Sequence, residues 1–183
     1  MIVIKTGQLR LRKPIDETLV AQSIEMLNVI FNLPAFGEAL SKETFVATNR
    51  PGFGNGETIP GLDVYNDFIS KGTLIVNLEI KKGGFFSVGW FRNVAFGTLG
   101  ETNVTGSTIV TYNSWLKKLT PRDRLIYYTT HIGHELFHTN YFGYIHDPAV
   151  ANADFKGERD VTYKVDEIIE KLINENYPNI TAN

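Results

Sequence analysis

The 183-residue sequence contains no cysteine, which excludes disulfides, thiolate zinc ligands and a cysteine nucleophile. It also lacks an excess of charge of one sign, because 18 basic and 20 acidic residues leave a formal charge of −2. Such a balance gives no electrostatic footprint for nucleic acid, so we expect no nucleic-acid partner.

Long apolar runs are missing as well. No run is long enough to span a bilayer, and the N-terminal sequence MIVIKTGQLRLRKP lacks the apolar core of a secretory signal. The chain as written is therefore expected to be cytoplasmic, or secreted if a signal has been removed. A hydrophobic content of 43% predicts a substantial core, and we expect residues 1–183 to form one domain.

The hydrophobic pattern predicts strands and helices in alternation, followed by two late helices. This order predicts an α+β fold with an α/β-like N-terminal part and a twisted mixed sheet. The expected strands lie at 2–12, 44–48, 73–81, 86–96 and 107–112, and the expected helices at 16–33, 63–71, 121–142 and 165–174.

The first late helix carries clear start and stop signals. Thr120 is a suitable N-cap, Pro121 fits the first helical position, and Asp123 follows where a capping acid belongs. The pattern extends to Phe142, and Gly143 suits a left-handed C-terminal stop.

All four histidines, His131, His134, His138 and His146, lie close together in and after this helix. His134 and His138 are four residues apart, so both imidazoles project from one face and reach one metal ion. Glu135 is displaced by about 100° around the helix, from where it reaches a water molecule on that ion. This HExxH pattern is typical of zinc-dependent hydrolases.

A catalytic zinc site needs a third protein ligand and an open position for water. His146 is the first candidate, because the break at Gly143 allows the chain to return to the metal. Glu158, 20 residues after His138, is the alternative. Asp147 is a candidate partner that orients a ligand. His131 either supports the site or is an ordinary core histidine.

The segment HELFHTNYFGYIHD resembles the zinc signature of the metzincin peptidases, HExxHxxGxxH, often followed by an acid. The matching residues are His134, Glu135, His138, Gly143, His146 and Asp147.

The sequence departs from the metzincin pattern in two respects. Four residues, Thr139 to Phe142, separate His138 from the glycine, where the family has two. The family's methionine turn is also missing, since Met1 and Met26 both lie far upstream. By position, Val161 to Tyr163 would take its place.

The resemblance implies a zincin-like architecture, in which a backing helix and an active-site helix pack on a twisted mixed sheet. Residues 1–183 would then be a single metallopeptidase-like catalytic domain. It also implies that a peptide substrate binds as an extra antiparallel strand. The sheet edge that receives it is expected at 86–96 or in the segment just after.

These features predict a zinc-dependent endopeptidase with one catalytic Zn²⁺, a peptide or protein substrate and Glu135 as general base. Two alternatives stay open. One is a gluzincin-type peptidase with Glu158 as third ligand, and the other is a non-catalytic peptide-binding module on a degenerate peptidase scaffold. Candidate phenol donors near the site are Tyr141, Tyr144 and Tyr163.

Overall fold

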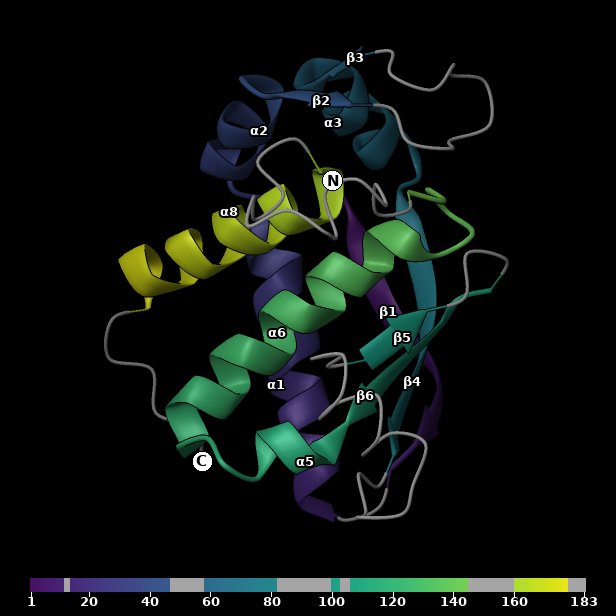
Figure 1. Cartoon of the computed structure of the whole chain (residues 1–183), viewed down its shortest axis with the longest axis vertical. Helices are drawn as coiled ribbons and strands as arrows, with labels where there is room; N and C mark the ends of the chain where they lie inside the picture. The colour runs from purple at the N-terminus through teal and green to yellow at the C-terminus, as the bar shows by residue number, and fades with distance from the viewer. Residues whose placement is uncertain (12–13, 47–57, 82–99, 103–105, 145–159, 178–183) are drawn as a thin grey trace.

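A computed structural model describes residues 1–11, 14–46, 58–81, 100–102, 106–144 and 160–177. Figure 1 shows how their helices and strands are arranged. In chain order these are β1 (Val3–Arg10), α1 (Pro14–Ile30), α2 (Pro34–Ser41), β2 (Thr44–Val46), β3 (Thr58–Pro60), α3 (Gly61–Ser70), β4 (Thr73–Lys81), β5 (Gly100–Thr102), β6 (Thr108–Tyr112), α5 (Asn113–Leu116), α6 (Pro121–His138) and α8 (Val161–Asn176).

The main sheet has four strands in the order β1-β4-β6-β5. β1, β4 and β6 run parallel, whereas β5 is antiparallel to β6 and is the last strand of the order. β2 and β3 form a separate antiparallel pair. The predicted α+β class with a mixed sheet is therefore confirmed at this coarse level.

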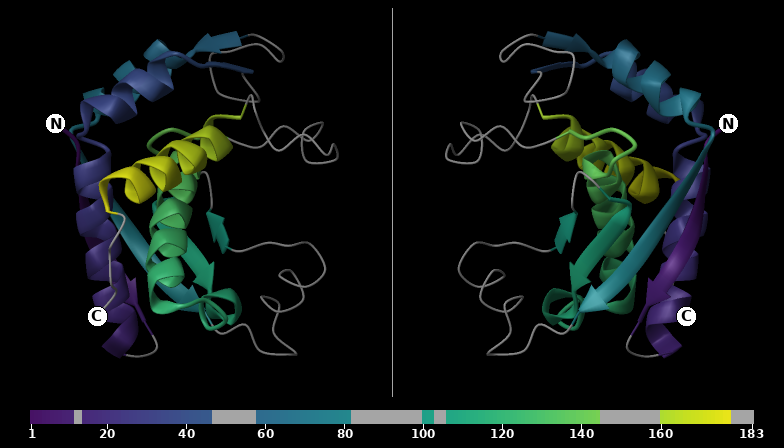
Figure 2. Two further views of the ribbon diagram at one scale, coloured as in Figure 1. Left: turned by 90° about the vertical axis from the view of Figure 1, so that its left-hand side faces the viewer. Right: turned by 90° about the vertical axis from the view of Figure 1, so that its right-hand side faces the viewer.

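α1 and α6 pack on one face of the main sheet and α8 packs on both of them, whereas α2 and α3 lie toward one end of the molecule (Figure 1). Figure 2 shows the sheet on one side of the molecule and α1, α6 and α8 on the other. Alternate side chains of β4 point into this core, because successive residues of a strand face opposite sides. The buried residues of β4 are Leu74, Val76, Leu78 and Ile80.

An aromatic cluster fixes the C-terminal end of α6 in this core. Phe137 stacks on Phe68 of α3 with 5.4 Å between ring centroids, and on Phe142 with 4.8 Å. Phe31 and Phe36 pack edge-on in the same cluster, with centroids 4.9 Å apart. The last turn of α6 is therefore held by residues from four segments of the chain.

The start of α6 agrees with the prediction, but its end does not. The Thr120 side chain accepts a hydrogen bond from the Asp123 amide at 3.2 Å, as expected for an N-cap. The helix ends at His138, four residues before the expected end, because Thr139 adopts an extended backbone with ψ 169°. Its hydroxyl donates to the carbonyl of Leu136 at 2.6 Å, which competes with continuation of the helix.

Other boundaries were predicted less well. α2 was not predicted. α8 begins at Val161 instead of Val165, because the Asp160 side chain caps it by accepting a bond from the Thr162 amide at 2.8 Å. The expected strand at 86–96 lies outside the described residues.

Within the described residues, no single helix is long and apolar enough to cross a membrane. The helices Asp16–Ile30 and Pro34–Ser41 are long and apolar enough only when they are taken together, and the chain bends by 70° between them.

Ile169 of α8 packs directly against α6 at Gly133. A Cβ at this position would overlap Cδ1 of the buried Ile169 and lie 3.4 Å from Cδ2 of Leu27. We expect Gly133→Ala to lower the free energy of unfolding by up to about 2 kcal/mol. Overpacking costs about 1–3 kcal/mol, and alanine's helix preference recovers about 1 kcal/mol. Urea denaturation followed by circular dichroism measures this change.

The control is the same substitution in an Ile169→Val background, which lacks the Cδ1 methyl. There Gly133→Ala should cost clearly less, since the two sites are coupled by contact. Strictly additive effects of the two substitutions would contradict the predicted overlap.

Candidate metal centre

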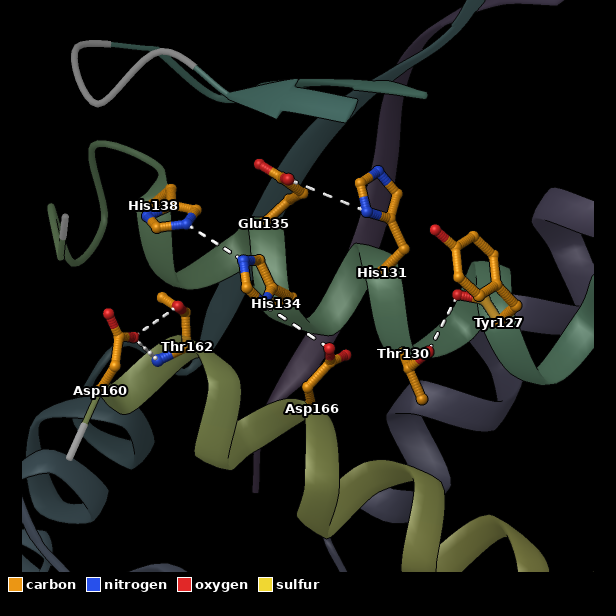
Figure 3. Close-up of polar contacts among 9 residues, drawn as sticks. All are labelled: Tyr127, Thr130, His131, His134, Glu135, His138, Asp160, Thr162 and Asp166. Carbon is orange, nitrogen blue, oxygen red and sulfur yellow. Dashed lines mark hydrogen bonds and ion pairs between the residues drawn. The ribbon is translucent and has the colours of Figure 1, made fainter. Parts of the chain in front are cut away.

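The C-terminal half of α6 carries four ionisable side chains that are almost completely buried. His131, His134, Glu135 and His138 are 6%, 8%, 7% and 7% exposed. Figure 3 shows these side chains together with residues of α8. Burying polar groups is unfavourable unless they find partners, so the contacts of each ring nitrogen decide what this site can do.

The two histidines of the motif bring their Nε2 atoms together at 3.3 Å. Their rings meet nearly edge to face, with centroids 5.1 Å apart and an interplanar angle of 68°. Two nitrogens bound to one tetrahedral zinc at about 2.0–2.1 Å lie about 3.3–3.4 Å apart. The separation of the two Nε2 atoms therefore fits a shared zinc ion.

His138 is oriented by the turn that follows α6. Its Nδ1 donates to the backbone carbonyl of Tyr144 at 2.6 Å, which leaves the Nε2 lone pair for a metal. Gly143, with φ +68°, makes this return possible, because a left-handed backbone is easily adopted only by glycine. The Tyr144 amide in turn donates to the carbonyl of Phe137 at 3.0 Å. Gly143 thus helps to orient His138 through this turn.

α8 supplies two further neighbours of the site, both in contact with His134. Oδ2 of Asp166 lies 3.7 Å from its Nδ1, and the Tyr163 ring packs edge to face against it with centroids 5.1 Å apart. Burial raises the pKa of Asp166 to about 7, with further contributions from Glu170, Glu135 and Glu167. Burial, followed by nearby carboxylates, also raises the pKa of Tyr163.

His131 lies next to the candidate general base. Its Nδ1 is 3.8 Å from Oε1 of Glu135, and its ring is parallel to that of Tyr127. Burial lowers the pKa of His131 to about 4, against the opposing effect of the Val110 carbonyl. His131 is therefore neutral at neutral pH, and its contact with Glu135 is not an ion pair. The structure places it inside the site.

The three tyrosines considered as phenol donors occupy different places. The Tyr141 hydroxyl binds the backbone of Ile75 in β4, accepting from its amide at 3.0 Å and donating to its carbonyl at 3.1 Å. Tyr144 is buried beside Phe137. The ring of Tyr163, which is 41% exposed, packs against the motif histidine His134.

The candidate third ligands are not among the described residues. His146, Asp147 and Glu158 all lie in the segment 145–159, outside them. The described residues contain no group of three His, Cys, Asp or Glu side chains that could hold a metal ion. Val161 to Tyr163, expected in place of a methionine turn, form the first turn of α8.

Comparison of the chain with protein-family models, curated proteins and solved structures found no match. The function of the protein therefore has to be inferred from the chemistry of the described side chains.

The neutral state of His131 predicts an acid sensitivity of folding. Its pKa is about 4 in the folded chain and 6.5 as the ordinary value, so the unfolded state binds a proton first as the pH falls. The stability that this group contributes is complete above pH 6.5 and is lost toward pH 4. The total is about 3 kcal/mol.

Urea unfolding of chelator-treated protein at pH 7 and pH 4.5 measures this loss. His131→Asn, which cannot titrate in this range, should lose clearly less stability between the two pH values. An identical pH dependence in this variant would show that other groups cause the loss.

Proposed function

We propose that this protein is a zinc-dependent endopeptidase. The observation that carries the proposal is the approach of the His134 and His138 Nε2 atoms to 3.3 Å, at the separation that a tetrahedral zinc requires. Glu135 stands between them on the same helix and is buried with them. Two imidazoles and an adjacent carboxylate are the donor set of a hydrolytic zinc site.

In this proposal His134 and His138 hold the zinc, with His146 as third ligand and Glu158 as the alternative. A bound zinc ion supplies Lewis acidity, which makes an attached water acidic and polarises a carbonyl group. Glu135 would take a proton from the water that attacks the peptide carbonyl and would return it to the leaving nitrogen. Burial of the Glu135 carboxylate strengthens its electrostatic interactions within the site.

The sheet supports a binding mode for the substrate. β5 is antiparallel, stands last in the strand order and contacts α6, the helix that carries the motif (Figure 2). A peptide in extended form would add to this strand through main-chain hydrogen bonds and lie along the metal centre. This arrangement supports the metzincin-like architecture implied by the sequence, with β5 in the segment just after 86–96.

Substitution of the general base tests the proposal. Purified protein should contain close to one zinc per chain and cleave an unfolded protein substrate. Glu135→Ala should retain zinc and lose cleavage by at least about 100-fold, because proton transfer contributes about 10²–10⁴ to the rate. Elemental analysis and a peptide-cleavage assay provide the two measurements.

Glu175→Ala is the matched control. Glu175 lies near the end of α8, and its ion-pair partner among the described residues is the solvent-exposed Lys171. It should change neither zinc content nor cleavage. Wild-type cleavage by Glu135→Ala would refute the assigned base. Bound zinc without any cleavage by the wild-type protein would instead favour a non-catalytic peptide-binding module.

A pair of variants identifies the third ligand. We expect His146→Ala to weaken zinc binding by more than about 100-fold, because even the outer partners of ligands contribute about 10- to 100-fold. Glu158→Ala should leave zinc binding close to wild type. Titration against a chelating dye measures both affinities. The opposite result would assign the gluzincin-type ligand set.

A further inference from the structure

We propose that Asp166 is a positioning residue of the metal centre, which holds His134 in the orientation and tautomer that bind the ion. The inference rests on the proposed function, because it assigns a role toward the same zinc ion. Figure 3 shows the Asp166 side chain reaching from α8 to the side of the His134 ring that faces away from His138.

The tautomer of His138 is set by its surroundings. Its Nδ1 lies 2.6 Å from the Tyr144 carbonyl, which can only accept a hydrogen bond. The proton of neutral His138 therefore sits on Nδ1, and its Nε2 carries a lone pair. That lone pair faces Nε2 of His134 at 3.3 Å.

The proton of neutral His134 can sit on Nε2 or on Nδ1. On Nε2 it would point at His138 and block metal binding, and the Nδ1 lone pair would face a carboxylate. On Nδ1 it faces Oδ2 of Asp166, 3.7 Å away. The ionised form of Asp166 at this distance favours the Nδ1 proton, which leaves the Nε2 lone pair directed at the metal position.

The distance of 3.7 Å exceeds that of a direct hydrogen bond, which is about 2.7–3.2 Å. The Asp166 side chain is 38% exposed, so it has room to close the gap by a small rotation. The imidazole is more restricted, because Tyr163 packs against one side and His138 against another. Asp166 is thus the adjustable partner and His134 the fixed one.

Two neighbouring lone pairs repel each other unless a cation lies between them. By setting the second lone pair in place, Asp166 makes the metal-free site unfavourable and the occupied site favourable. Outer partners of this kind contribute about 10- to 100-fold to metal affinity. We therefore expect Asp166 to act mainly through zinc affinity and only indirectly through the rate of cleavage.

The experiment compares Asp166→Ala and Asp166→Asn with Glu170→Gln. Glu170 lies one turn further along α8 and contributes to the same local field, so its substitution removes a like charge without touching His134. Zinc affinity is measured on the full chain by competition with a chelating dye. A long-range ¹H–¹⁵N spectrum of the chelator-treated protein at about pH 8.5, above the pKa of Asp166, reports which His134 nitrogen carries the proton.

Both Asp166 variants should bind zinc about 10- to 100-fold more weakly, and Glu170→Gln should stay within about twofold of the wild type, which lies inside the usual effect of a surface charge. The His134 Nδ1 proton should be present in the wild type and reduced in Asp166→Ala. Unchanged zinc affinity and an unchanged tautomer in Asp166→Ala would overturn the proposal and leave the zinc site intact.

Failure of the proposed function gives a different result. If the wild type binds no zinc, the spectrum of the metal-free protein decides the role of Asp166 alone. Loss of the His134 Nδ1 proton in Asp166→Ala would still support a positioning role, and its persistence would overturn it.

Discussion

Leu136 and Phe137 lie between the two histidines of the motif, and both are completely buried. At about 100° per residue, Leu136 lies on the side of α6 opposite His134 and His138, and Phe137 lies beside them, about 60° from His134 and about 100° from His138. Their packing fixes the rotation of α6 about its axis, because turning the helix would withdraw Phe137 from its stack with Phe68 and Phe142. Every other feature of the site depends on this rotation.

The same packing sets the end of the helix. Thr139 leaves the helical path directly after His138, and the chain turns back so that Tyr144 binds the Phe137 carbonyl. The carbonyl of Tyr144 is thereby delivered to Nδ1 of His138. The aromatic core, the turn and His138 are thus one connected unit, in which Gly143 provides the left-handed residue.

Local signals in the sequence were sufficient to predict the start of α6, which carries the motif, and the strand β4. Thr120, Pro121 and Asp123 predicted the start of α6, and the alternation in 73–81 predicted β4 with its observed bounds. The spacing of His134 and His138 predicted that their rings would meet. These features follow from helical and strand geometry, which depends on neighbouring residues alone.

Features set by tertiary contacts were not predictable in this way. The early end of α6 depends on side-chain bonding by Thr139, whereas the apolar pattern continues to Phe142. Asp166 was overlooked because it flanks the apolar face of α8, where an acidic residue is usually only solvated. Its proximity to His134 arises from the crossing of α8 over α6, which brings together residues 32 positions apart in the sequence.

The crossing of α8 over α6 also connects stability with metal binding. α8 can approach α6 closely because Gly133 leaves no side chain in the way of Ile169. That approach brings Asp166 to one nitrogen of His134, while the turn brings the Tyr144 carbonyl to one nitrogen of His138. Each imidazole is therefore oriented from outside, and their Nε2 atoms are turned toward each other. In the proposed centre, folding establishes a repulsion that a cation relieves, so that metal binding stabilises the packing that created the site.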